Sequence, residues 1–491
     1  MSDDPVGRIA PEVFGHFAEH LGRCIYGGLW VGDDDRVETA DGLRRDTLDL
    51  LSALEPPVLR WPGGCFADDY HWRDGIGPRT DRPTRRNLWW AQGRDQTFLE
   101  PNDFGTEEFL RLCRMLETKP YLAGNVGTGT PDELLDWVEY CNGSMETEPV
   151  TRRYDHGPKD PHDVRWWGIG NENWGCGGRF DPADYGRQYR TFANYLRAVD
   201  RHTDIIGDLE LVGCGHITPD WNQTFLEAVE DPSLIDHLSI HRYLECGGDV
   251  EFSEAQYYGL LARARQVGAD VDRAAATIEA VMPDADIGVI VDEWGVWHPQ
   301  AVASNGLEQE QTVRDAIVAG GILNALIRRA DIVTMANLAQ TVNVLQCVVQ
   351  TNETAAWPTP TYQVFHAYRP HMESTALQVD IQTETKDIPD EDHNLPLIDA
   401  AVSRTDDGLF ATIVNHDLDG PRRVQLQPSQ SIEDRTAQVT ELFASLQVDA
   451  YSTRTNAGQF APEGRSVDLA GDGTVEVELP AGSVTTVSIG G

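Results

Sequence analysis

The sequence predicts an α/β protein in which a (β/α)8 TIM barrel is followed by an antiparallel β-sandwich. Over roughly the first 365 residues, short apolar runs alternate with helix-length amphipathic segments, which is the pattern of successive βα units. Beyond them, short strand-like runs follow one another and are separated by Asp- and Gly-rich turns. No G-x-G-x-x-G segment opens a helix after the first strand, which argues against a doubly wound open sheet.

The barrel is expected over residues 13–365. Its eight strand-like runs are residues 13–18, 58–61, 120–126, 164–169, 210–214, 237–240, 287–291 and 332–336. They are nearly continuous in apolar residues, as expected for parallel strands that are covered on both faces. Helical segments between them are expected at residues 107–116, 131–141, 182–203, 256–281 and 308–330.

The sandwich is expected over residues 366–491, and residues 1–12 are expected to join it. Its strands are predicted at residues 395–403, 409–415, 422–426, 438–442, 474–479 and 484–489. The sequence shows no internal repeat and no low-complexity linker, so the two domains should pack closely.

The charge of the chain is strongly negative. Asp and Glu number 80 against 39 Lys and Arg, which gives a formal charge of −41, and the only lysines are Lys119, Lys159 and Lys386. Acid enrichment with few lysines is typical of proteins that stay soluble in concentrated salt, where ions screen the self-repulsion. We therefore predict a salt-adapted protein. Nucleic acid is excluded as a partner because no basic stripe is present to meet phosphates.

The eight cysteines are scattered, without a C-x-x-C pair or the spacing of zinc ligands. The first residues show no basic and apolar regions of a signal peptide, and no run approaches the ~20 apolar residues of a membrane span. These features predict a cytoplasmic protein with reduced cysteines and no membrane partner.

Two glutamates follow apolar strands that are far apart in the sequence. Glu172 comes after the run 164–169, and Glu293 comes after the run 287–291. Carboxylates at the C-terminal tips of barrel strands face the loops where such barrels carry out chemistry. Paired carboxylates with aromatic neighbours are what cleavage of a glycosidic bond requires. The structural alternative is that each glutamate pairs with an arginine at a strand end.

The segment His16–His20 has the H-x-x-E-H spacing of an inverted zinc motif. That motif requires a helix, whereas this segment ends an apolar strand, so metal ligation is disfavoured. We expect Glu19 to point into the barrel mouth and bind sugar hydroxyls, with His16 and His20 in supporting hydrogen bonds.

Other strand ends supply further candidates, each with a structural alternative as a turn or packing residue. Arg60 precedes a Gly-Gly pair and can orient a carboxylate, and Tyr243 can hold the nucleophile ionised. The remaining candidates are Asn125 and His241 as supporting residues, Gln340 as a ring contact, and Trp297 and the pair Trp89-Trp90 as stacking platforms. No G-x-S-x-G elbow is present, which disfavours a serine hydrolase.

With these residues in hand, the chain resembles the α-L-arabinofuranosidases of glycoside hydrolase family 51. The matching runs are residues 15–23, 60–64, 170–173, 292–294 and 338–344. The resemblance implies a (β/α)8 barrel with a β-sandwich to which both chain ends contribute. It also implies retaining removal of terminal arabinofuranosyl groups from oligo- or polysaccharides, without a cofactor or metal, by a protein that is often a hexamer.

The resemblance further implies the role of each site residue. Glu172 is expected to protonate the leaving oxygen and later to deprotonate water, while Glu293 attacks the anomeric carbon. Sugar-binding roles are implied for Glu19, Asn171, Tyr243 and Gln340. Cys65 stands where many relatives have Asn, so its thiol would form a weaker hydrogen bond to the sugar. β-Xylosidase or endoglucanase activity on the same scaffold, and a non-catalytic sugar-binding barrel, remain alternatives.

Overall fold

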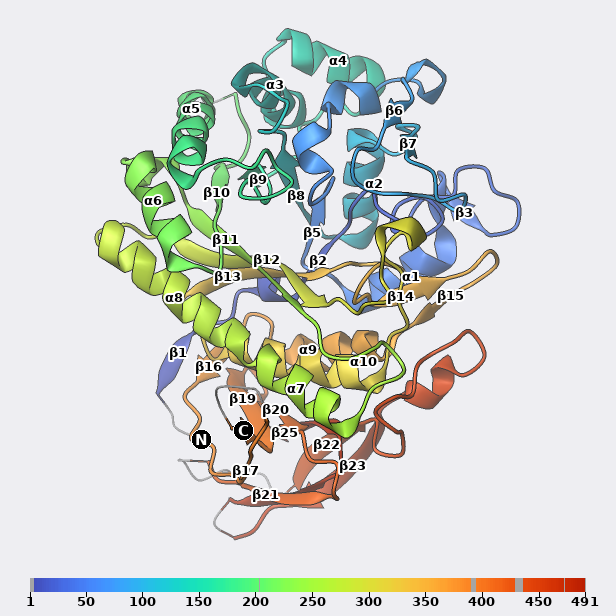
Figure 1. Ribbon diagram of the computed structural model, residues 1–491, viewed down its shortest axis with the longest axis vertical. Coiled ribbons are helices and arrows are strands. Elements are labelled where there is room, and N and C mark those ends of the chain that lie inside the picture. The colour runs from blue at the N-terminus through green and yellow to red at the C-terminus, as the bar shows by residue number, and fades with distance from the viewer. Residues whose placement is uncertain (1–3, 203, 390–393, 429–435, 472, 491) are drawn as a thin grey trace.

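The computed structural model describes residues 4–202, 204–389, 394–428, 436–471 and 473–490. Its larger part is a closed barrel in which eight strands pair in parallel, surrounded by helices (Figure 1). The strands are β2 (Gly15–Phe17), β5 (Val58–Trp61), β8 (Lys119–Gly124), β9 (Trp166–Ile169), β10 (Glu210–Cys214), β11 (His237–Leu244), β12 (Gly288–Val296) and β13 (Val333–Ala339). The predicted barrel is thereby confirmed.

The helices are α1 (Arg45–Leu54), α2 (Thr106–Leu116), α3 (Pro131–Asn142), α4 (Glu148–His156), α5 (Pro182–Asp200), α6 (Pro219–Val229), α7 (Glu254–Ala264), α8 (Gln266–Val281), α9 (Val313–Ile327) and α10 (Pro360–Tyr368). Several begin with a capping side chain followed by proline: the Thr130 hydroxyl accepts a hydrogen bond from the Glu133 amide at 3.2 Å. The helix predicted over 256–281 is instead two helices, which meet at Arg265. None of the helices in the described ranges combines the length and the apolar character needed to span a membrane.

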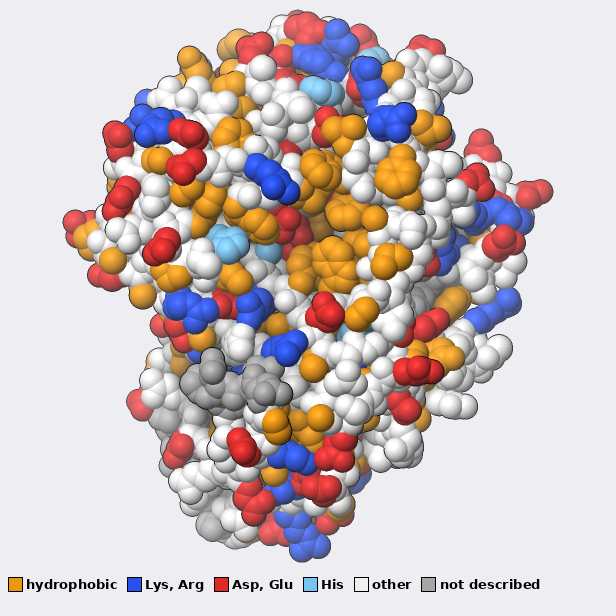
Figure 2. Space-filling model, viewed as in Figure 1, with side chains coloured by type: hydrophobic (Ala, Val, Ile, Leu, Met, Phe, Trp, Pro, Cys, Tyr) orange, Lys and Arg blue, Asp and Glu red, His pale blue; other side chains and the backbone are white. Residues whose placement is uncertain are grey.

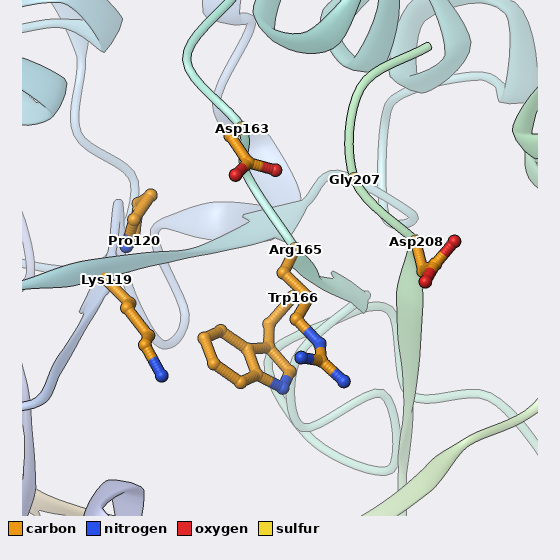
Figure 3. A pocket seen from close by; sticks show the side chains of 7 residues that line it. All are labelled: Lys119, Pro120, Asp163, Arg165, Trp166, Gly207 and Asp208. Atoms are coloured by element: carbon orange, nitrogen blue, oxygen red, sulfur yellow. The ribbon is translucent and has the colours of Figure 1, made fainter. Parts of the chain in front are cut away.

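An apolar layer fills the N-terminal half of the barrel interior. It is formed by Val58, Tyr121, Trp166, Val212, Ile290 and Met335. Trp166, the first residue of β9, lies at the N-terminal mouth of the barrel beside a cavity of about 310 Å³. Lys119 and Arg165 approach its ring to 5.6 and 5.5 Å (Figure 3). This end is therefore plugged, and the polar groups of the barrel gather at the opposite, C-terminal end.

The smaller part is an antiparallel sandwich. Its larger sheet has the order β1-β16-β19-β20-β25-β22-β23, and β21 pairs with β24 across a separate apolar cluster that includes Val402, Val477 and Val487. The strands are β1 (Pro5–Arg8), β16 (Thr375–Leu377), β19 (Ile398–Thr405), β20 (Gly408–Asn415), β21 (Arg422–Leu426), β22 (Thr436–Leu442), β23 (Glu463–Asp468), β24 (Val475–Leu479) and β25 (Ser483–Gly490). The predicted sandwich is confirmed. Strand β23 escaped prediction because it is exposed and has no apolar alternation.

Short antiparallel strand pairs lie outside the barrel sheet and the sandwich sheets. The hairpins pair β3 (Thr39–Ala40) with β4 (Leu43–Arg44), β6 (Arg85–Arg86) with β7 (Leu99–Glu100), β14 (Val349–Thr351) with β15 (Ala356–Pro358), and β17 (Thr385–Lys386) with β18 (Leu395–Pro396). Helices α7, α9 and α10 lie between the barrel and the sandwich (Figure 1).

Strands β11 and β12 are longer than predicted. They were expected to end at residues 240 and 291, but they stay paired to Leu244 and Val296. The polar residues that suggested strand ends are instead buried inside the barrel mouth, and the continued register sets His241 opposite Glu293. This register places the side chains of His241 and Glu293 next to each other in the candidate site.

Candidate active site

Glu172 and Glu293 meet at the C-terminal mouth of the barrel. Glu293 lies within β12, and Glu172 follows β9 in a loop where its own φ is +42°. One carboxylate oxygen of each lies within 4.8 Å of the other. On the surface, this mouth is a hollow with acidic side chains in it and hydrophobic side chains around it (Figure 2).

The Glu293 carboxylate receives a donor on each oxygen. Arg60 Nη1 donates to its Oε1 at 2.8 Å, and the Tyr243 hydroxyl donates to its Oε2 at 2.8 Å. The second arm of Arg60 donates to Asn171 Oδ1 at 2.6 Å. Arg60 is only 1% exposed, so its two-armed guanidinium fixes Glu293 and Asn171 relative to each other in a poorly solvated site.

His241 links three carboxylates. Its Nδ1 lies 3.0 Å from Glu172 Oε1 and 3.5 Å from Glu293 Oε2, and its Nε2 lies 3.0 Å from Asp292 Oδ1. Burial disfavours the charged imidazole, but Glu293 and Asp292 outweigh it and raise the pKa of His241 to about 10. His241 is therefore an imidazolium at neutral pH.

Asp292 supplies a negative charge next to the His241 imidazolium. Burial raises its pKa, but Arg60 and His241 outweigh burial and hold the pKa of Asp292 at about 2. The Tyr121 hydroxyl donates to Asp292 Oδ2 at 2.9 Å. The result is a buried network in which two cations, Arg60 and His241, stand among the carboxylates.

Glu19 is the third glutamate of the site. Its Oε1 accepts hydrogen bonds from the Phe66 amide and from Trp90 Nε1, each at 3.1 Å, and Gln340 Nε2 donates to its Oε2 at 3.0 Å. Burial, reinforced by the charge of Glu293, raises the pKa of Glu19 to about 8. A β-carbon added at Gly64 would lie 3.2 Å from oxygens of both Glu19 and Glu293, so glycine there lets the backbone approach both.

Two family models match most of the chain. Residues 50–246 match the α-L-arabinofuranosidase 1 domain, and residues 292–483 match the α-L-arabinofuranosidase C-terminal domain. An intracellular exo-α-L-arabinofuranosidase of Bacteroides ovatus is 34% identical over 490 residues, which cover 98% of this chain and 93% of that protein. The α-L-arabinofuranosidase C of Emericella nidulans is 36% identical over 376 residues, 72% of each protein.

Solved structures agree with these matches. The GH51 arabinofuranosidase of Xanthomonas axonopodis pv. citri has a TM-score of 0.91 at 31% identity and covers 99% of this chain and 98% of its own. The α-L-arabinofuranosidase of Thermotoga maritima, in an arabinose complex, has a TM-score of 0.87 at 30% identity with the same coverage. The chain belongs to glycoside hydrolase family 51. It is therefore a glycoside hydrolase of the α-L-arabinofuranosidase family.

Two histidines of this family 51 enzyme do not take the predicted supporting roles. The His16 ring lies 4.7 Å from the Phe365 ring in a tilted arrangement, and burial lowers its pKa to about 3; neither of its ring nitrogens has a hydrogen-bond partner among the described residues. His20 bonds instead to Glu100 at 2.7 Å and accepts from Trp61 at 3.1 Å. His16 lies in β2 and His20 lies beyond its end, and the two rings contact different residues, so the zinc-like spacing carries no ligand set.

The prediction of reduced cysteines is wrong for one pair. Cys65 and Cys176 form a disulfide with a Cα–Cα distance of 5.5 Å, and Cys176 Sγ lies 3.5 Å from Glu172 Oε2. The two residues are 111 positions apart, and only the barrel brings the loops after β5 and β9 together. The Cys65 thiol therefore cannot donate a hydrogen bond to a sugar, contrary to expectation.

Two groups of potential metal ligands occur in the described chain, and neither suits a metal. One consists of Glu172 with Cys65 and Cys176, whose sulfurs are bonded to each other. The other consists of Glu172, Glu293 and His241. His241 is protonated at neutral pH, and a protonated imidazole has no lone pair for a metal.

Two other candidates lie at the margin of the site. Asn125 holds the turn after β8, where its Oδ1 accepts from the Thr128 and Gly129 amides at 2.9 Å. Trp297 meets the Tyr243 ring edge-on at 5.4 Å, and its Nε1 donates to Ala301 O.

Sequence reasoning missed two buried groups. These are the Tyr121 hydroxyl on Asp292 and the carboxylate of Asp68, described below. No local motif marks either residue, because each acts on a neighbour that is distant in the sequence.

Proposed function

We propose that this enzyme removes terminal α-L-arabinofuranosyl groups from oligo- or polysaccharides with retention, using Glu293 as nucleophile and Glu172 as acid/base. The observation that carries the mechanism is the separation of the two carboxylates, with one oxygen of each within 4.8 Å. Retaining glycosidases hold their carboxyl groups about 5–5.5 Å apart, whereas inverting enzymes leave about 6.5–9.5 Å for a water molecule. The substrate class rests on membership of family 51.

In the first step Glu293 attacks the anomeric carbon, the glycosidic bond breaks, and Glu172 gives its proton to the departing oxygen. Arg60 and Tyr243 each donate a hydrogen bond to the attacking carboxylate and orient it. In the second step water attacks the glycosyl-enzyme ester, Glu172 takes the proton of that water, and Glu293 is released as a carboxylate.

Unpaired polar atoms support a sugar-binding role for the surrounding residues. Asn171 Nδ2 and Gln340 Oε1 are buried, and neither has a hydrogen-bond partner among the described residues. The Arg60 bond fixes the Asn171 amide, so Nδ2 is left for a hydroxyl of the ligand. Glu19 borders the same space and presents a carboxyl group to the ring.

We also propose a salt-adapted, intracellular and oligomeric enzyme. The charge of −41 and the three lysines support salt adaptation. The intracellular relative from Bacteroides ovatus supports the location. The oligomer rests on the family resemblance, and light scattering after chromatography in molar KCl tests it, because a monomeric mass would rule it out.

The experiment that tests the function combines a substrate panel with two variants. Hydrolysis of 4-nitrophenyl α-L-arabinofuranoside should far exceed that of the matching β-xyloside and β-glucoside, and NMR should show a first product that keeps the anomeric configuration. Glu293→Ala should be inactive, and azide should restore turnover to give the inverted arabinosyl azide. Labelling of another residue by a mechanism-based trap, or loss of activity in a chelator, would contradict the assignment.

A further inference from the structure

Asp68 is a buried carboxylate that joins three loops at the barrel mouth. It is 3% exposed and lies on the short 3-10 turn Ala67–Asp69, which follows the loop after β5. Its Oδ1 accepts hydrogen bonds from the Val126 amide at 2.8 Å and the Gly127 amide at 3.0 Å, in the loop after β8. Within the described chain it forms no ion pair, and burial raises its pKa to about 7 against these hydrogen bonds. A charge buried without a cation is costly, so its presence calls for an explanation.

The second oxygen of Asp68 contacts the residues on both sides of Glu172. Asp68 Oδ2 accepts from the Asn171 amide at 2.8 Å and from Asn173 Nδ2 at 3.4 Å. Asn173 Nδ2 also donates to Gly177 O at 2.8 Å, which closes the loop beyond Glu172. The carboxylate therefore clamps the peptide that enters Glu172 and the side chain that follows it.

This clamp acts where the backbone is unusual. Glu172 has a φ of +42°, a region that non-glycine residues rarely adopt, so contacts outside the residue must hold it there. Close packing leaves little freedom: a β-carbon at Gly177 would lie 2.4 Å from Asp68 Oδ2 and 2.0 Å from Asn171 O. No other carboxylate among the described residues accepts a hydrogen bond from the backbone amide of Asn171.

We propose that Asp68 is the positioning residue for Glu172, holding the acid/base carboxyl where its proton reaches the departing oxygen. The proposal rests on the acid/base role of Glu172 given above. A carboxylate that merely stabilises the loops would affect all substrates alike. Loss of a positioning residue should lower kcat/KM most for substrates whose leaving group departs only when it is protonated.

The test compares Asp68→Asn with Glu172→Ala on two substrates, one with an alkyl or sugar leaving group and one with a 4-nitrophenyl group. In either orientation the new amide turns its NH2 toward backbone donors, so at least one loop connection breaks. We expect kcat/KM of Asp68→Asn to fall about 100-fold on the poor leaving group, the loss typical of a misplacement near 1 Å. The loss on the activated substrate should stay below about tenfold.

Asp69→Asn is the matched control, because Asp69 lies on the same turn and its side chain makes no hydrogen bond or ion pair with a described residue. It should retain wild-type kcat/KM on both substrates. If Asp68→Asn does not fold, Asn173→Ala removes one donor to Asp68 and should show the same bias at smaller size. Equal losses on both substrates, with Glu172→Ala still discriminating, would overturn the positioning role alone. If Glu172→Ala does not discriminate, the acid/base assignment fails and this proposal fails with it.

Discussion

Replacing His241 with glutamine should remove a defined part of the pH dependence of the enzyme's stability. In the folded protein the pKa of His241 is raised to about 10, because Glu293 and Asp292 outweigh the opposing effect of burial, whereas an unfolded histidine titrates near 6.5. Between these two values the folded chain holds a proton that the unfolded chain has lost. Stability from this imidazolium is therefore fully present below pH 6.5 and disappears as the pH rises through 10.

The size of the effect follows from the shift. A difference of roughly 3.5 pH units corresponds to about 5 kcal/mol at 1.36 kcal/mol per unit. Melting temperatures of wild type and His241→Gln should be furthest apart at pH 6 and should converge by pH 10. The control is His216→Gln, because burial lowers the pKa of this half-buried histidine instead of raising it, so its loss should not reproduce the dependence on pH. A gap between wild type and His241→Gln that stays constant or widens from pH 6.5 to 10 would refute the charged histidine.

Three further predictions concern the nucleophile, the surface and the disulfide. Tyr243→Phe should lower kcat/KM by about tenfold or more, because Glu293 loses a hydroxyl donor at 2.8 Å, while an unchanged rate would show that Arg60 suffices. Melting temperature should rise with KCl into the molar range because salt screens a charge of −41; a flat response would remove the case for salt adaptation. Cys65→Ala/Cys176→Ala should cost about 2–4 kcal/mol of stability, measured by denaturant unfolding, and dithiothreitol should then destabilise wild type only.

The fold was predictable because the barrel strands are buried on both faces. Their apolar runs stand out from the amphipathic helices, and the runs ending near Glu172 and Glu293 fall on β9 and β12. Where polar residues stay inside a strand the prediction stopped short, as at His241. Polarity signals exposure in a sequence, whereas in the barrel mouth polar side chains are buried against one another.

The parts of the site that could not be predicted depend on contacts between distant loops. The disulfide joins residues 111 positions apart. Asp68 acts on Asn171 across 103 positions. No periodic pattern or local motif in the sequence indicates the partner of Cys65, Cys176 or Asp68. Similarly, the spacing of His16 and His20 looks like a ligand set, and only the separate contacts of the two rings, with Phe365 and with Glu100, show that it is not.

Tyr121 has a consequence for how this enzyme can change. Its ring belongs to the apolar layer that fills the N-terminal half of the barrel, and its hydroxyl donates to Asp292 at 2.9 Å. The same ring lies 5.6 Å from the Arg60 guanidinium. Tyr121 thus contacts both the apolar layer and the charged network. Substitutions that repack the apolar layer will shift the Tyr121 hydroxyl and thereby change the turnover rate. Selection for heat tolerance and selection for activity are therefore coupled at this residue.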